Sequence, residues 1–436
     1  MPRRHWILVA FVVGLALHNI VMASLWRAGL RGTGLTVVEA WKEALLGGAL
    51  AWYALVAFRR RALPFRWGAV DWLALAFAAL VVLYALIPQS ALGGEAGLSA
   101  VAHGARHDLL FVGAYFLGRC LGPVPREVGV VLLAAAAAVA AFGLVEEYLV
   151  SLNWWRFHSG AVGWYRHQLG FDYKGLSGLP ENFVYNTGND RPVRRLVSTF
   201  LSPLASAYML CVALLLAAAW RRAWTIPLAA LAAAGLLWTY SRSTWIALAA
   251  GLVVLALARR RAWPVVAAAA TLAVAAGFAQ AFPHVAPEAR FTPRELEYQH
   301  QQAKKAATNT QTTTSDASTR EHLASLREGL KAVAKHPQGY GLGNAGSTAM
   351  RFEVKPVAGE STYTEIGVDA GLAALAVFLA FNLLLLWRLL RRSPWVAASL
   401  AAVLVLAVQT DVIGVPWLAF CVWAFAGGEL AGRMGE

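Results

Sequence analysis

Charged residues are scarce in this sequence. Asp, Glu, Lys and Arg make up only 14% of its 436 residues, compared with about 25% in an ordinary soluble domain. Hydrophobic residues account for 58%, and the mean hydropathy is +0.53. These values exclude a soluble globular fold. Because apolar runs recur along the whole chain, they predict an all-α, polytopic membrane protein.

Cysteine is also rare. The three cysteines (Cys120, Cys211 and Cys421) lie in apolar runs, so we interpret them as small core residues. No CxxC or HExxH spacing occurs, and the sequence therefore predicts no metal site. The glycines of GYGLG, at 339–343, are not followed by the Lys-Ser/Thr of a phosphate-binding loop. We expect them to let the backbone approach a ligand or a neighbouring helix.

Acidic residues are outnumbered by basic ones, and the net charge is +14. Such an excess suggests nucleic-acid binding in a soluble protein. Here most arginines fall in short loops between apolar runs, as the positive-inside rule predicts, so no nucleic-acid partner is expected. Since about 20 apolar residues span a bilayer, the chain has twelve candidate spans: 6–26, 38–58, 68–88, 107–122, 128–149, 197–219, 224–240, 242–258, 264–282, 361–387, 395–411 and 414–431.

Every second loop between these spans is short and basic. This alternation predicts that both termini are cytoplasmic and that the other loops face outward. Apolar residues at helical spacing predict an amphipathic helix from Arg320 to Lys335, inside the larger outward loop. The predicted organisation is N-terminal membrane helices in 1–149, an outward loop in 150–196, central membrane helices in 197–282, a large outward loop in 283–360 and C-terminal membrane helices in 361–436.

Three arginines break the positive-inside pattern. Arg242 lies in a very short outward loop, and Arg194 and Arg195 open the sixth span on the same side. Guanidinium groups fork onto phosphate oxygens, so these positions suit an anionic ligand. The alternative is that the arginines extend to lipid headgroups and anchor the membrane surface.

Carboxylates at the outer ends of spans form a second group of candidates. Glu360 opens the tenth span, with Tyr363 one turn later. Glu360 is either a general base or a charge favoured by the helix N-terminus. Glu146, Glu147 and the lone His336 are further candidates for a base. Asp369 lies about two turns inside the span, and we expect it to face protein because a charge facing lipid is costly.

Four segments together resemble the O-antigen ligase and polymerase superfamily of bacterial membrane glycosyltransferases. They are RRLVSTF at 194–200, TYSRSTW at 239–245, the helix opened by Arg320 with the following HPQGYGLGNAG at 336–346, and ESTYTEIGVDAGL at 360–372. Arg195, Arg242 and Arg320 match the arginines of the family's motifs. The resemblance covers roughly residues 194–372, and the span count and the large outward loop agree with it elsewhere.

The resemblance implies an all-helical membrane fold of the GT-C type in the bacterial inner membrane, with the active site on the periplasmic or outer face. It implies a donor glycan linked to undecaprenyl diphosphate, an acceptor glycan or glycolipid, and arginines that hold the diphosphate. It also implies that no metal or other cofactor is needed. Membrane lipids surround such an enzyme, and a chain-length regulator is a further expected partner.

One position departs from the family pattern. Ligases carry a His-Asn or similar pair at the opening of this span, whereas this chain has Glu360-Ser361. The departure favours a Wzy-type polymerase with Glu360 as the base. The first alternative is an O-antigen ligase that transfers glycan to lipid A core or another acceptor, and the second is a transporter or flippase of a lipid-linked substrate. Aromatic residues of the first outward loop are expected to stack on sugars or to form an interfacial belt: Trp154, Trp155, Trp164 and Tyr165.

Overall fold

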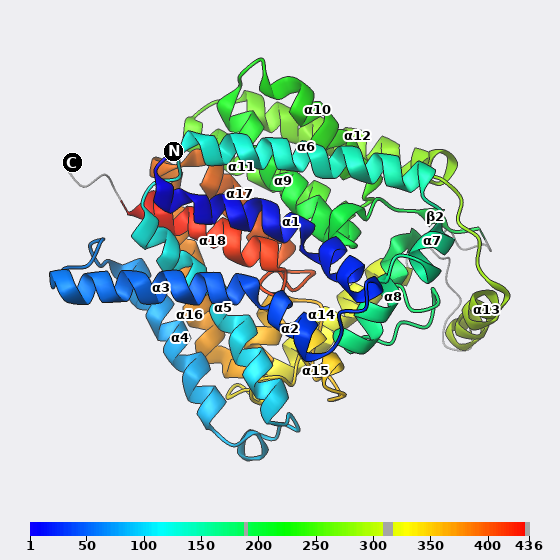
Figure 1. Ribbon diagram of the computed structural model, residues 1–436, viewed down its shortest axis with the longest axis horizontal. Coiled ribbons are helices and arrows are strands. Elements are labelled where there is room, and N and C mark those ends of the chain that lie inside the picture. The colour runs from blue at the N-terminus through cyan, green and yellow to red at the C-terminus, as the bar shows by residue number, and fades with distance from the viewer. Residues whose placement is uncertain (187–190, 308–316, 432–436) are drawn as a thin grey trace.

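A computed structural model describes residues 1–186, 191–307 and 317–431, without the side chains of 302–307 and 317–321. Helices dominate the described residues (Figure 1). The twelve predicted spans coincide with twelve of these helices: α1 (Trp6–Arg27), α3 (Trp41–Arg60), α4 (Ala69–Leu86), α5 (Leu98–Leu121), α6 (Arg126–Leu149), α9 (Pro203–Trp220), α10 (Thr225–Trp238), α11 (Arg242–Arg259), α12 (Trp263–Val285), α16 (Thr362–Arg392), α17 (Pro394–Leu406) and α18 (Pro416–Leu430).

The all-α, polytopic fold class is thereby confirmed. Seven helices in the described part of the chain are long and apolar enough to cross a membrane by themselves. Two more, α10 and α17, are shorter and apolar. The predicted fourth span, 107–122, falls almost entirely within α5, which begins nine residues earlier, at Leu98. Its first turns are polar, and it therefore reads as loop in a hydropathy scan.

Glycines let the central helices approach closely. A Cβ at Gly118 of α5 would clash with the carbonyl of Ala424 in α18, and a Cβ at Gly427 of α18 would clash with the carbonyl of Tyr115. Small residues permit such backbone contact between membrane helices. Figure 1 shows α1, α5 and α18 in the middle of the bundle, with α6, α10 and α12 along one side of the view.

The first outward loop folds against the ends of these helices. It contains α7 (Leu152–Phe157), α8 (Ala161–Gly163) and a short antiparallel pair, β1 (Val184–Tyr185) with β2 (Val193–Arg194). Trp155 and Trp164 are buried in the apolar core of this loop, whereas Trp154 is 37% exposed. Trp155 is thus a core residue and belongs neither to a sugar platform nor to an interfacial belt.

The second outward loop contains α13 (Pro293–Ala307), α14 (Ala317–Lys335) and α15 (Gly346–Arg351). Helix α14 confirms the predicted amphipathic helix. It lies close to α16 because Gly329 faces Thr364 and Val333 faces Gly367. Its Leu323 and Leu330 remain about half exposed.

Helix α16 is interrupted at Gly371, where φ is +78° and ψ is 175°. The glycine-rich segment after α14 docks on this break. The amide of Tyr340 donates to the carbonyl of Val368 at 2.6 Å, and the amide of Leu372 donates to the carbonyl of Pro337 at 2.7 Å. A Cβ at Gly339 would clash with the backbone of Gly371. The predicted role of these glycines in close approach to a helix is therefore confirmed.

Candidate functional site

Two of the predicted arginines converge in the structure. Arg195 follows β2, and its Nε donates to the carbonyl of Thr239 at 2.9 Å, while Nη2 is 3.4 Å from the carbonyl of Tyr240. Arg242 is the first residue of α11, and its guanidinium lies 6.0 Å from the centre of the Tyr240 ring. The turn 239–242 therefore carries one arginine and holds the other. We call Arg195 and Arg242 the cation pair.

Among the described residues no carboxylate is within ion-pairing distance of the cation pair, although the buried carboxylate of Glu147 attracts Arg195 from farther away. Within the described ranges, neither Arg195 nor Arg242 forms an ion pair. Burial and the neighbouring charge of Arg242 lower the pKa of Arg195 to about 10. Arg195 still carries its charge at neutral pH, so two cations share one partly buried place. This arrangement costs free energy unless an anion binds there.

Arg194, adjacent in sequence, has the opposite environment. Its guanidinium forms an ion pair with Glu146 at 2.9 Å and also donates to the carbonyl of Val150. Trp155 donates to the same carboxylate at 3.0 Å, and Arg194 is only 4% exposed. Arg194 is thus neutralised inside the protein, which favours a structural role over the predicted contact with substrate.

Tyr363 and His336 do not join the cation pair in the described contacts. The hydroxyl of Tyr363 donates to the carbonyl of Leu404 at 2.7 Å and ties α16 to α17. Arg320 belongs to α14, but its side chain lies outside the described residues. His336 packs against Tyr340, with ring centres 4.4 Å apart, in the turn that docks on α16.

Glu360 lies at the exposed mouth of α16. It precedes the N-cap residue Ser361 and adopts a positive φ of 68°. Its carboxylate is 2.6 Å from Nδ1 of His322 in α14, and the side chains of Glu360 and His322 are 47% and 43% exposed. Among the described contacts Glu360 makes no side-chain cap of the helix. The geometry thus supplies an accessible carboxylate paired with an imidazole.

The loop 407–415 between α17 and α18 connects the mouth of α16 with the cation pair. Thr362 donates through Oγ1 to the carbonyl of Thr410 at 3.0 Å, and the amide of Val412 donates back to Thr362 at 2.9 Å. The buried hydroxyl of Tyr208 lies beside Thr410, where it interacts with the charges of Arg195 and Asp411. The loop therefore contacts the start of α16 directly, and Tyr208 beside it interacts electrostatically with Arg195.

A cavity of about 560 Å³ is lined in part by Ile413 and Gly414 of this loop. The sequence did not predict this cavity. Basic side chains and aromatic rings line it together with Glu39 and Glu43, and Glu43 forms ion pairs with Lys42 and Arg106. Aromatic rings beside charged and polar groups suit a sugar ligand. The residues of interest in its wall are Lys42, His103, Arg106, His107, Trp164, Tyr165, Phe171 and Arg351.

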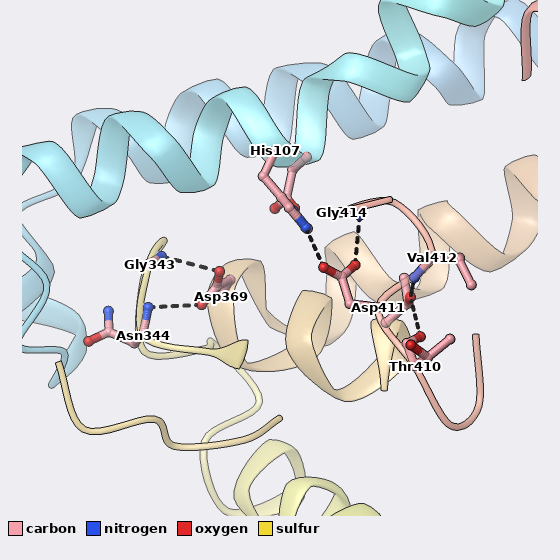
Figure 2. A network of polar contacts seen from close by, with 10 residues as sticks. His107, Gly343, Asn344, Asp369, Thr410, Asp411, Val412 and Gly414 are labelled. Carbon is pink, nitrogen blue, oxygen red and sulfur yellow. Dashed lines mark hydrogen bonds and ion pairs between the residues drawn. The ribbon is translucent and has the colours of Figure 1, made fainter. Parts of the chain in front are cut away.

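Four carboxylates gather around His107 next to this cavity, and we call these five residues the acidic cluster. Figure 2 shows three of them, His107, Asp369 and Asp411. Asp411 lies 2.8 Å from Nε2 of His107 and accepts from the amide of Gly414 at 2.9 Å. Asp369 accepts from two backbone amides of the docked segment, and it faces protein as predicted. The members of the cluster are His107, Asp108, Glu365, Asp369 and Asp411.

Asp411 could have been found by the rule already applied to Asp369. Asp411 is the single charged residue of the short loop between α17 and α18, and a charge between two apolar helices is costly unless it is functional. His107 and Asp108 were hidden because the predicted span began at 107, which placed them at its edge. Tyr208 gives no signal, since a tyrosine in an apolar helix is ordinary.

Known proteins were compared with the chain. Residues 227–379 match the model of the family described as O-Antigen ligase. The match contains the turn with Arg242, the second outward loop and the start of α16. No curated protein matches the sequence significantly.

Proposed function

We propose that this chain is a membrane glycosyltransferase of surface polysaccharide assembly in the bacterial inner membrane, and the match of residues 227–379 to the O-Antigen ligase family supports this. Its donor is a glycan linked to undecaprenyl diphosphate, and its acceptor is a sugar hydroxyl on the outer face. The observation that carries the proposal is the cation pair, in which Arg195 and Arg242 converge without an ion-paired carboxylate in the described structure.

The cation pair serves the leaving group. When the bond between the anomeric carbon and the diphosphate oxygen breaks, negative charge develops on the diphosphate. Arg195 is already fixed by the carbonyls of Thr239 and Tyr240, so it stabilises that charge with little reorganisation. Preorganised cations at a developing charge are usually the largest contribution to such catalysis, and the planar guanidinium binds phosphate oxygens in a bidentate manner.

Glu360 serves the acceptor. The acceptor hydroxyl loses its proton to the Glu360 carboxylate while its oxygen forms the new bond to the anomeric carbon. His322, 2.6 Å from the carboxylate, holds Glu360 in place. Since one displacement occurs, the anomeric centre is inverted. The basic and aromatic cavity beside loop 407–415 accommodates the glycan, because its volume of about 560 Å³ fits a few sugar rings.

Polymerisation is the favoured reaction, since Glu360-Ser361 replaces the pair that ligases carry at the start of this span. Ligation is the second candidate, because the matching family is described as O-Antigen ligase. The two reactions differ only in the acceptor: another lipid-linked glycan for a polymerase, and a lipid A core or other molecule for a ligase.

The test uses the purified full-length protein in lipid nanodiscs. It is given an undecaprenyl-diphosphate glycan alone, and products are resolved by mass spectrometry. Longer glycans still bound to undecaprenyl diphosphate support a polymerase. Products that form only after lipid A core is added support a ligase and overturn polymerisation. Failure to release undecaprenyl diphosphate with either acceptor overturns the proposed function.

A further inference from the structure

Three segments far apart in sequence bring metal-ligating side chains together. His107 lies in α5, Glu365 in the first turn of α16 and Asp411 in loop 407–415. One donor atom from each lies within 4.8 Å of the others. Nε2 of His107 and Oδ2 of Asp411 are 2.8 Å apart, close to the roughly 3 Å between neighbouring ligands of a metal with bonds of about 2.1 Å.

The charges of the acidic cluster do not balance. The Glu365 carboxylate is repelled by Asp411, Asp369 and Asp108 and attracted by His107. In the described part of the chain, no Lys or Arg forms an ion pair with any of these four carboxylates. Burying like charges is unfavourable unless they are protonated or a cation lies among them.

Two members of the cluster also lack the partners that a buried carboxylate needs. Glu365 is only 8% exposed, and its carboxylate accepts no hydrogen bond from a described residue. Asp108 is 3% exposed, and its Oδ2 has no hydrogen-bond partner in the described chain. Glycines pack against two carboxylates of the cluster. A Cβ at Gly346 would clash with the Glu365 carboxylate, and one at Gly414 would clash with the Asp411 carboxylate.

We propose that His107, Glu365 and Asp411 bind a divalent cation of the zinc or manganese class. One imidazole with two carboxylates is a donor set that suits these ions. Asp108 Oδ1 lies 2.7 Å from Nδ1 of His107. A carboxylate in this place accepts the Nδ1 proton and leaves Nε2 free for the metal, as around most metal-bound histidines.

The ion has a positioning role that goes beyond the proposed glycan transfer and does not depend on it. It joins α5 and the start of α16 to loop 407–415, the same loop that contacts Thr362 and Tyr208. The site has no local sequence motif, because Glu365 lies 258 residues after His107 (365 − 107) and Asp411 lies 46 residues after Glu365 (411 − 365). This explains why the sequence predicted no metal.

The experiment uses tag-free, full-length protein stripped with a chelator and dialysed. Zn²⁺, Mn²⁺, Mg²⁺ and Ca²⁺ are added separately, and bound metal is counted by mass spectrometry while the melting temperature is recorded. We expect one Zn²⁺ or Mn²⁺ per chain and a rise in Tm, because an ion that binds only the folded state stabilises it. Absence of stoichiometric binding by both ions overturns the site.

Variants and spectroscopy locate the ion. Glu365→Gln and Asp411→Asn should each lower the affinity for the ion at least tenfold, whereas the matched control Asp172→Asn, at an exposed carboxylate, should leave it unchanged. Binding that survives in both cluster variants overturns the assignment. If these variants do not fold, pulsed EPR of Mn²⁺ bound to the wild-type protein decides: coupling to one imidazole nitrogen supports the site, and its absence overturns it.

Discussion

Two groups of like charge meet at loop 407–415, and they have opposite signs. Arg195 of the cation pair interacts electrostatically with Tyr208, which lies beside Thr410 of the loop, and the acidic cluster includes Asp411 of the loop itself. Three other buried pairs are matched within the chain: Arg119 with Asp71, Arg156 with Glu295 and Arg194 with Glu146. Paired charges therefore hold helices and loops together, whereas the cation pair and the acidic cluster each need a counter-ion from outside the chain.

Glu360 belongs to neither group, and its replacement gives the largest expected effect. Glu360→Gln keeps the size of the side chain but cannot accept a proton, so turnover should fall by about 10²–10⁴-fold, the usual contribution of a general base. Donor binding should stay near wild type, because the cation pair is intact. Turnover measured on purified protein checks this. Near wild-type turnover in this variant would show that Glu360 is not the general base, and Glu147 and His336 would then be the next candidates.

Conservative changes in the cation pair keep its positive charge and test the geometry of its guanidinium groups. Arg195→Lys and Arg242→Lys retain charge but lose the planar fork, and each should lower turnover by about 10²–10³-fold. Binding of the lipid-linked donor should weaken in parallel. Arg166→Lys, at an exposed outward arginine paired with Asp172, is the matched control and should change neither quantity. If turnover and donor binding are the same in all three variants, the cation pair has no part in the mechanism.

Arg194 is expected to differ from its neighbour Arg195. Arg194→Ala leaves the buried Glu146 carboxylate without its cation, which should lower the free energy of unfolding by about 3–5 kcal/mol. The double change Arg194→Ala with Glu146→Ala should recover part of this loss. Chemical denaturation in detergent measures both. Donor affinity of the folded Arg194→Ala protein should remain normal, and a specific loss of donor binding would place Arg194 with the cation pair after all.

The smallest effect is expected inside the acidic cluster. In metal-stripped protein, Glu365→Gln removes one of several repelling carboxylates, so Tm should rise slightly, on the order of 1–3 °C. Asp71→Asn is the matched contrast: Asp71 is equally buried but is paired with Arg119 at 2.8 Å, so its neutralisation should lower Tm. A fall in Tm in both variants would show that the cluster is balanced without a cation.

Sequence alone predicted where the apolar helices lie, and seven of them are long and apolar enough to cross a membrane, because a span needs about 20 apolar residues and composition records this directly. It could not separate Arg194 from Arg195. Both open the same span, but extended backbone sends successive side chains to opposite sides, and so one meets Glu146 while the other meets the turn 239–242. Their different surroundings come from α6 and α10, which are distant in sequence.

The acidic cluster was missed for a related reason. Asp369 was recognised as facing protein, since an acid inside a span has few other options. Its neighbours His107 and Asp411 come from α5 and from the loop before α18, and no periodicity links positions so far apart. Glu360 was placed correctly at a helix mouth, but its partner His322 lies on another element. Sequence pattern therefore defines elements, and packing between elements defines the site.

The break at Gly371 has a consequence for biogenesis. On both sides of it, backbone groups of α16 find partners in the preceding segment: the carbonyl of Val368 accepts from Tyr340, and the amide of Leu372 donates to Pro337. Lipid offers no substitute for these partners. During synthesis, α16 can therefore mature only after the 283–360 loop has folded back onto it. A nascent chain with a defective 337–343 segment should stall before its last two spans assemble and be recognised by quality-control proteases.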